Sequence, residues 1–256
     1  HIKRFIHLGS AAEYGFGPRP FAETAKEKPA NPYGTSKLQQ SALVKAFAKK
    51  NKIKTINLRI FNVIGVPKKS KAAASRRPTL FEALVSQFGP EFKGTISVSN
   101  KNDVRDFVAR EDLMQAIFAA LQSKKGGMYE VVNIGSGRGT TLNEVVRIFG
   151  HHVNKEYKII NQSPKATRSV ANIAKAKRVL GWSTTTTLED SIRATVGAKR
   201  RVIVVGAGIA GEMLVAEIAK EGRSDIIAIG FVDDDTKKQG TSVHGLRVLG
   251  GVDDLP

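Results

Sequence analysis

The sequence predicts an α/β protein in which helices cover both faces of a largely parallel sheet. The main observation is an alternation along the chain, where short apolar runs that suit buried strands are followed by segments with apolar residues at helical spacing. A second observation is the length of 256 residues with 41% apolar content, which suits about two domains, each with its own core. A disordered chain and a disulfide-stabilised miniprotein are therefore excluded.

The first predicted elements are two strands joined by a helix. Residues 5–8 and 55–61 are apolar runs of strand length. Between them, Leu38, Leu43 and Phe47 fall at helical spacing within residues 37–50. The order strand, loop, helix, strand is the one that connects neighbouring strands of a parallel sheet.

The later elements continue this alternation. Residues 129–134 form another strand-like run, and Thr141 with Glu144 makes a capping box that marks the start of the next helix. Two further helices are predicted over residues 171–180 and 187–196. Residues 135–139 are rich in glycine, and they are interpreted either as a phosphate-binding loop or as a turn that leads into the capped helix.

A domain boundary is predicted near residue 198. Residues 197–201 are interpreted as a linker, and a new buried strand follows at 202–205. The charge also changes at this point: residues 199–256 hold 8 basic and 9 acidic residues, whereas residues 1–198 hold 33 basic and 14 acidic ones. The net charge of +18 therefore belongs to the first unit.

The positive charge makes nucleic acid a partner to consider, because basic surfaces release counterions from phosphates. The basic residues are spread along the chain, however, and neither a recognition helix nor an aromatic stacking platform is present. Nucleic acid is therefore not an expected partner. One basic cluster is interpreted either as a solvated surface or as an attractant for a phosphorylated substrate; it consists of Lys68, Lys69, Lys71, Arg76 and Arg77.

Composition also limits the location and the chemistry of the protein. There is no cysteine, so disulfides and thiolate catalysis are excluded, and the spacing of His7, His151, His152 and His244 suits no metal site. No apolar run approaches the ~20 residues of a membrane-spanning helix. We expect a cytoplasmic protein without a metal. The chain starts inside a strand-like run and without methionine, so we also expect that part of the natural polypeptide is absent.

Tyr33 and Lys37 stand one helical turn apart at the start of the first predicted helix, so both side chains project from the same face. An ammonium group beside a phenol favours the phenolate form, which a general acid or base requires. The alternative is a surface tyrosine beside a solvated lysine, and the spacing alone leaves both interpretations open.

Ser10 follows the strand at residues 5–8, and the carboxyl ends of parallel strands are where open α/β sheets bind ligands. The combination of Ser10, Tyr33 and Lys37 resembles the extended short-chain dehydrogenase/reductases that act on nucleotide sugars, the NAD-dependent epimerase/dehydratase family. Further matches occur in the same order, so that the resemblance covers residues 4–196; these are residues 58–65, 103–108, 133–137 and 179–182.

The resemblance implies a Rossmann-like, doubly wound parallel sheet and a catalytic set. Tyr33 would exchange a proton with a sugar hydroxyl, Ser10 would hydrogen-bond the same hydroxyl, and Lys37 would hold the nicotinamide ribose. NAD, with NADP as the alternative, would take a hydride from a sugar carbon. Asn62 and Arg105 would contact the diphosphate of a nucleotide-sugar substrate.

Two parts of this implied site have alternatives. Arg105 could instead form an ion pair with Asp103 or Asp106. Family members that dehydrate the sugar carry an Asp-Glu pair where this chain has Ala11 and Ala12, so dehydration is disfavoured. The neighbouring Glu13 could be a displaced carboxylate, although a solvated turn residue is the favoured interpretation.

The resemblance therefore favours an epimerase like the UDP-hexose 4-epimerases, in the synthesis of cell-surface polysaccharide precursors. A dehydratase or reductase of the same family is an alternative, and so is a non-catalytic nucleotide-binding or scaffolding fragment. The family also implies a homodimer formed through the helix that begins near Tyr33.

The family's dinucleotide-binding loop, Gly-x-x-Gly-x-x-Gly, does not precede Ser10. A glycine pattern instead occurs late in the chain, where Gly206, Gly208 and Gly211 follow the strand at 202–205. A predicted helix and strand come next, and Asp233 stands where an acid binds a ribose hydroxyl in dinucleotide sites. These four residues are therefore predicted to bind a nucleotide cofactor.

Two interpretations explain the late glycine loop: a circular permutation, or a second domain that is cut short. The second is preferred, because residues 230–235, 248–250 and 253–256 resemble the N-terminal nucleotide-binding domain of CapD-like polysaccharide-biosynthesis sugar dehydratases. Residues 1–198 would then be the C-terminal portion of an epimerase/dehydratase domain. Residues 199–256 would begin a truncated second Rossmann-like domain.

Overall fold

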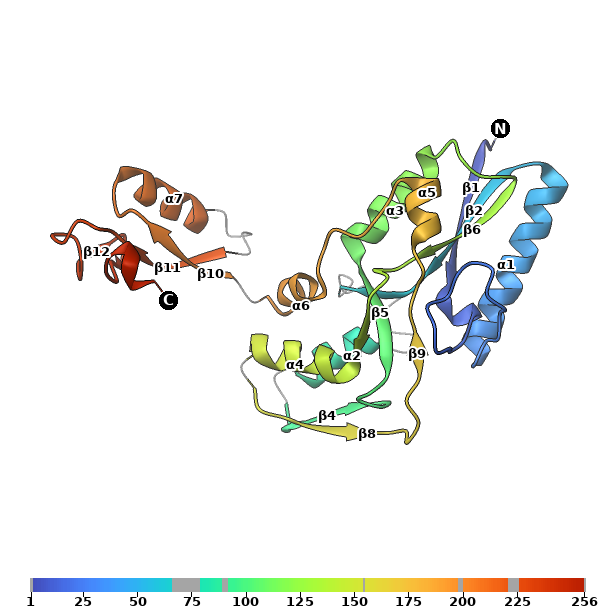
Figure 1. The fold of residues 1–256 in the computed structure, drawn as a ribbon, viewed down its shortest axis with the longest axis horizontal. Coiled ribbons are helices and arrows are strands. Elements are labelled where there is room, and N and C mark those ends of the chain that lie inside the picture. Colours follow the sequence, from blue (N-terminus) through green and yellow to red (C-terminus); the bar gives the residue numbers. More distant parts are fainter. Residues whose placement is uncertain are drawn as a thin grey trace. The chain divides into compact units, whose positions relative to one another are not determined.

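The computed structural model describes residues 2–65, 79–88, 92–153, 155–197, 200–220 and 226–255. The chain divides into two compact units, His1–Thr195 and Val196–Pro256 (Figure 1). The basic cluster between residues 68 and 77 lies outside the described residues. Within the described part of the chain, no helix has the length and apolar composition needed to cross a bilayer.

The first unit is built on a parallel sheet of three strands in the order β1-β2-β6. Ser10 pairs with Ile60, and Ile60 pairs with Ile134, so the carboxyl ends of the three strands meet at one edge. The strands are β1 (Arg4–Ser10), β2 (Lys54–Ile60) and β6 (Tyr129–Ile134). This parallel arrangement with intervening helices confirms the predicted fold class.

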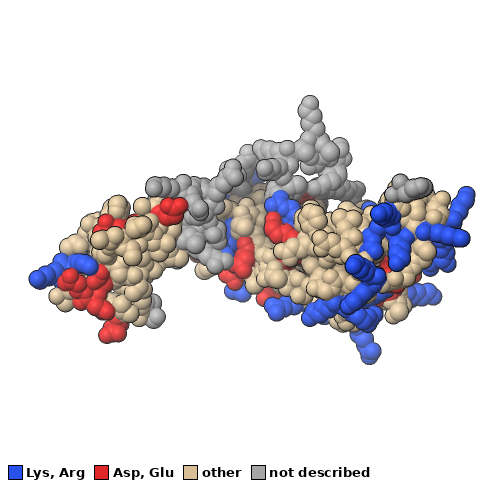
Figure 2. Space-filling model, turned by 90° about the horizontal axis from the view of Figure 1, so that it is seen from above, with Lys and Arg blue, Asp and Glu red and all other residues tan. Residues whose placement is uncertain are grey.

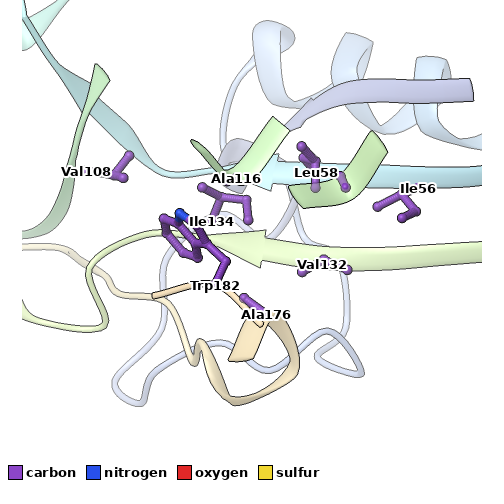
Figure 3. Close-up of a cluster of buried hydrophobic side chains, with 9 residues drawn as sticks. Ile56, Leu58, Val108, Ala116, Val132, Ile134, Ala176 and Trp182 are labelled. Atoms are coloured by element: carbon purple, nitrogen blue, oxygen red, sulfur yellow. The ribbon is translucent and has the colours of Figure 1, made fainter. Parts of the chain in front are cut away.

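One face of this sheet is apolar and packs against α3 (Arg110–Gln122) and α5 (Ala174–Leu180). Figure 3 shows side chains of the strands directed toward this helical layer and Trp182. The small side chains of Ala116 and Ala176 allow the helices to approach closely. Each fully buried aliphatic side chain of the cluster contributes about 1.5–3 kcal/mol.

On the other face of the sheet, the side chains of the central strand β2 are polar, although they are equally buried. Along β2, Thr55, Asn57 and Arg59 alternate with Ile56 and Leu58, and all five side chains are at most 4% exposed. The polar side chains lie on the side of α1 (Pro32–Asn51), as the contact between Asn57 and the helix residue Ser41 shows. The alternation is that of a strand whose two faces are both covered.

The other strands of the first unit form two further small sheets. Parallel pairs join β3 to β5, β5 to β9 and β4 to β8, whereas β7 runs antiparallel to β5. The strands are β3 (Asn62–Ile64), β4 (Thr95–Val98), β5 (Val104–Ala109), β7 (Gly139–Thr141), β8 (Lys158–Asn161) and β9 (Arg168–Ser169). The accompanying helices are α2 (Leu80–Gln87), α4 (Leu142–Val153) and α6 (Leu188–Val196).

The first helix begins at Pro32, which confirms the predicted start near Tyr33; the Asn31 side chain caps it by accepting the Gly34 N–H at 2.8 Å. One other predicted boundary differs from the structure. The helix predicted from residue 171 begins at Ala174, because Ala171 forms a β-bridge with Phe21.

The second unit is a strand-helix-strand segment followed by a small hairpin. β10 (Arg200–Val205) and β11 (Ile226–Val232) are parallel, and α7 (Ile209–Lys220) connects them. The hairpin consists of β12 (Ser242–Val243) and β13 (Leu246–Arg247). β10 begins inside the predicted linker, of which residues 198 and 199 lie outside the described part.

Lys and Arg side chains gather over one end of the first unit in the view of Figure 2, where Asp and Glu are sparse. The positively charged first unit also carries exposed lysines at the carboxyl end of α1, among them Lys49 and Lys50. Basic side chains at this position also stabilise a helix by compensating its dipole.

Candidate active site

Ser10 is held in place by a tight turn at the end of β1. Its hydroxyl accepts the Ala12 N–H at 3.2 Å, and its own N–H donates to Glu13 Oε1 at 3.0 Å. These reciprocal bonds form a capping box on the 3-10 turn Ala11–Glu13. Because the hydroxyl acts as an acceptor within the turn, its proton remains available to donate.

The first turns of α1 place Tyr33 and Lys37 beside Ser10. Lys37 Nζ donates to the backbone oxygen of Leu8 at 3.2 Å, which fastens the helix to β1. Tyr33 is 58% exposed. Between them, Gly34 lets the helix approach the Ser10 turn, since an added Cβ would lie 2.5 Å from the backbone oxygen of Ala12.

These side chains line one cavity of about 910 Å³ at the carboxyl edge of the sheet. Ser10, Tyr33, Lys37 and Asn62 all contribute to its wall, as do the aromatic side chains of Phe61, Phe81 and Phe107. Its volume is within the range of cavities that bind small molecules and cofactors. The structure thus brings together four of the predicted site residues.

Arg105 does not line this cavity. Its guanidinium stacks over the Phe16 ring at 5.0 Å and pairs with Asp103 at 3.2 Å. Nη1 donates to the backbone oxygens of Val104 and Thr167, and Nη2 also donates to Thr167 Oγ1. Burial lowers the pKa of Arg105, and the neighbouring Asp103 opposes that change. The ion-pair alternative with Asp103 is therefore the arrangement present.

Asp106, the other candidate partner of Arg105, binds the glycine-rich segment at residues 135–139. Its carboxylate accepts the N–H groups of Ser136, Gly137 and Ala171 and the Ser136 hydroxyl. The amides that would cradle a phosphate are thus already occupied by a carboxylate. This segment is therefore a structural turn rather than a phosphate-binding loop. Asn62 lies nearby and donates to the backbone oxygen of Asp106 at 2.9 Å.

Glu13 was expected to be a solvated turn residue or a displaced catalytic carboxylate, and both expectations were wrong. Its side chain is fully buried and does not line the cavity. The carboxylate accepts from the Ser41 hydroxyl at 3.0 Å and from Arg59 Nε at 2.9 Å. Sequence reasoning missed Arg59 and Ser41, although a charged residue inside the apolar run at 55–61 was a usable signal.

The late glycine loop belongs to the second unit. Gly206 has a φ of +91°, and an added Cβ on Gly211 would lie 2.0 Å from the Gly206 oxygen, so the turn itself requires both glycines. A Cβ added at Gly208 would meet no heavy atom within 4 Å apart from those of its chain neighbours. The Asp233 carboxylate accepts the Ala207 N–H at 2.7 Å and thereby holds the loop.

The fold and the cavity together define a Rossmann-like α/β protein with a serine, a tyrosine and a lysine at the carboxyl end of its strands. The sequence model of the NAD dependent epimerase/dehydratase family matches residues 1–135. The chain belongs to this family.

Similar proteins include several nucleotide-sugar enzymes. UDP-arabinose 4-epimerase 1 from Arabidopsis thaliana is 28% identical over 209 residues, which are 75% of this chain and 50% of that protein. The dTDP-4-dehydro-6-deoxyglucose reductase from Escherichia coli is 29% identical over 182 residues, 70% of this chain and 55% of that protein. The chain therefore spans about half the length of the curated relatives it matches.

A solved structure is similar over a comparable share of the chain. It is a mutant of UDP-glucuronic acid 4-epimerase from Bacillus cereus in complex with UDP-4-deoxy-4-fluoro-glucuronic acid and NAD. It is 26% identical to this chain, with a TM-score of 0.65, and the match covers 75% of this chain and 60% of that chain. This likeness confirms the Rossmann-type fold.

Proposed function

We propose that the protein is an NAD-dependent nucleotide-sugar epimerase of the UDP-hexose 4-epimerase kind. The observation that carries this proposal is the single cavity lined by Ser10, Tyr33 and Lys37. The names of the similar proteins, which include 4-epimerases of UDP-arabinose and UDP-glucuronic acid, support a UDP-sugar as substrate. A cytoplasmic role in polysaccharide precursor synthesis is part of the same proposal.

The residues of the cavity fit the nicotinamide end of a dinucleotide. Lys37 Nζ uses one donor on the Leu8 oxygen, and an ammonium group has further donors for ribose hydroxyls. NAD, when bound, supplies the acceptor for a hydride from the sugar carbon. Tyr33 and Ser10 face the same cavity, where they can contact one substrate hydroxyl.

The proposed reaction starts with proton removal from a sugar hydroxyl. The Tyr33 oxygen takes this proton as the general base, and Lys37 lines the same cavity. The Ser10 hydroxyl donates a hydrogen bond to the substrate oxygen, and this bond holds that oxygen in place. When the hydride returns to the opposite face of the keto carbon and the Tyr33 proton returns to the keto oxygen, the carbon is inverted and no net oxidation has occurred.

Dehydration of the sugar is disfavoured by the residues that line the cavity. A dehydratase needs carboxylates for elimination, but positions 11 and 12 are alanines and Glu13 is buried in another contact. Among the described lining residues there is no Asp or Glu. Asn62 is the proposed substrate contact on this wall, whereas Arg105 would have to exchange its present partners for phosphate oxygens.

We infer a nucleotide-binding role for the second unit, as the start of another Rossmann-like domain. Its support is Gly208, because neither backbone conformation nor packing requires a glycine there, whereas the close approach of a phosphate would. Gly206, Gly211 and Asp233 would shape the loop around that ligand.

The test is an assay of the full chain with NAD and a panel of UDP-sugars. Interconversion of a 4-epimer pair, with no consumption of NAD, is the expected result. Net accumulation of NADH would indicate a dehydrogenase, and nucleotide binding without turnover would support the scaffolding alternative. Either result would contradict the proposed epimerase.

A further inference from the structure

A buried carboxylate joins the two elements that carry the proposed catalytic side chains. Glu13 Oε1 accepts from the Ser10 N–H and from the Ser41 hydroxyl, each at 3.0 Å. Ser10 ends β1, whereas Ser41 lies in the middle of α1. One oxygen can accept two hydrogen bonds, so this atom links the Ser10 turn directly to the helix.

The position of Ser41 on the helix gives this link its importance. Ser41 follows Lys37 by four residues and Tyr33 by eight, so the three residues lie along the same side of α1. A bond that holds Ser41 therefore also limits how far Tyr33 and Lys37 can slide or rotate relative to Ser10.

A buried arginine pairs with Glu13 and holds its side chain in place. Glu13 Oε2 accepts from Arg59 Nε at 2.9 Å, and the Arg59 side chain is only 3% exposed. Arg59 also contacts Glu27 Oε1 at 2.8 Å and lies 4.5 Å from the centre of the Tyr14 ring. A buried carboxylate with a paired cation accepts stronger hydrogen bonds than a neutral group does.

Neighbouring residues close this cluster tightly. Asn57 Nδ2 donates to Ser41 Oγ at 2.9 Å and fixes the orientation of that hydroxyl. Gly9 is required at the end of β1, because an added Cβ would lie 2.3 Å from Asn57 Oδ1 and 2.9 Å from Glu13 Oε1. The cluster thus has little room for another arrangement.

We propose that Glu13 is a positioning residue that, through Ser41, sets the placement of Ser10 relative to Tyr33 and Lys37. Its effect on turnover rests on the proposed epimerase function. Its effect on the Ser10 turn does not rest on that function, so the positioning role of Glu13 and the epimerase function can be tested separately.

The experiment compares two variants of the full chain with two controls. Glu13→Gln removes the charge with little change of shape, and Ser41→Ala removes only the helical partner. Asp112→Asn and Ser191→Ala are matched controls, since Asp112 is an equally buried carboxylate and Ser191 is a buried helical serine that donates to Thr187. Neither control residue lines the cavity.

The first readout is steady-state kinetics with a UDP-sugar, measured at a temperature well below the unfolding temperature of each variant. Both Glu13→Gln and Ser41→Ala should lower kcat by roughly tenfold or more, because small displacements of reacting groups are costly. KM should change by less than about twofold, and the controls should change neither constant by more than about twofold. Losses of kcat in the controls equal to those in the two variants would overturn the proposal.

Hydrogen exchange at the Ser10 amide gives a readout that does not depend on activity. Glu13→Gln should accelerate this exchange by roughly tenfold relative to Asp112→Asn, because a charged acceptor is replaced by a neutral one. Equal exchange in the two variants would show that Glu13 does not hold the turn. A wild-type chain without any turnover would refute the epimerase, and the exchange result would still decide the role of Glu13.

Discussion

Gly34 shows how one residue without a side chain can shape the candidate site. It lies in the first turn of α1, where the helix passes the backbone of the Ser10 turn. Nothing in its φ requires glycine, because it is not among the residues with positive φ. The close approach of the helix to the turn requires it instead.

Gly34→Ala should therefore separate α1 from the Ser10 turn. We expect a loss of about 1–3 kcal/mol in the free energy of unfolding, as for other overpacked sites, together with a lower kcat. Urea unfolding and steady-state kinetics measure these two effects. Gly127→Ala is the control, because its Cβ would meet only the end of the Glu130 side chain at 3.4 Å. Unchanged stability in Gly34→Ala would contradict the tight contact.

At the scale of elements, α3 is joined to the segment after α5 by Asp112. Its carboxylate accepts from the hydroxyls of Thr184 and Thr185 and from the N–H groups of Thr185 and Thr186. Burial alone would raise the pKa of Asp112, but these hydrogen bonds hold it below its usual value. The segment leading into α6 is therefore fixed by one carboxylate.

This arrangement predicts a pH-dependent contribution to stability. Because the folded state has the lower pKa, the contribution is complete above the unfolded pKa of about 3.9 and is lost as the pH falls through the folded value. Asp112→Asn should lower the free energy of unfolding by about 1–3 kcal/mol at pH 7. This difference from wild type should shrink as the pH falls below about 3.9, where the wild-type carboxylate is protonated. Urea unfolding across pH checks this, and a difference that is constant with pH would contradict it.

At the scale of the whole molecule, periodicity was enough to predict the fold class, whereas the family resemblance was needed to assign Ser10, Tyr33, Lys37 and Asn62 to one site. These residues lie at element ends that local patterns reveal: Ser10 ends β1, Tyr33 and Lys37 stand in the first turns of α1, and Asn62 begins β3. The burial of Glu13 depends on Arg59, which is 46 residues away, and the contacts of Arg105 include Thr167, 62 residues away. Such partners are chosen by tertiary packing, which local patterns do not encode.

The outer face of α1 leads to a prediction about assembly. Leu43 is 72% exposed and Phe47 is 45% exposed, and apolar side chains gathered on a helix face favour association. If a homodimer forms through α1, Leu43→Glu should convert it to a monomer in sedimentation experiments. Phe118→Glu, on the exposed side of α3, serves as the control and should leave the mass unchanged. A dimer that survives Leu43→Glu would place the interface elsewhere.

The proposed proton transfer depends on the phenol of Tyr33, and Tyr33→Phe removes only that oxygen from a 58% exposed side chain. With NAD and UDP-sugar saturating, we expect kcat to fall by about 10²–10⁴-fold and the unfolding temperature to stay unchanged. Tyr157→Phe, whose ring packs against Phe88, should retain full turnover. Wild-type turnover in Tyr33→Phe would rule out Tyr33 as the acid/base.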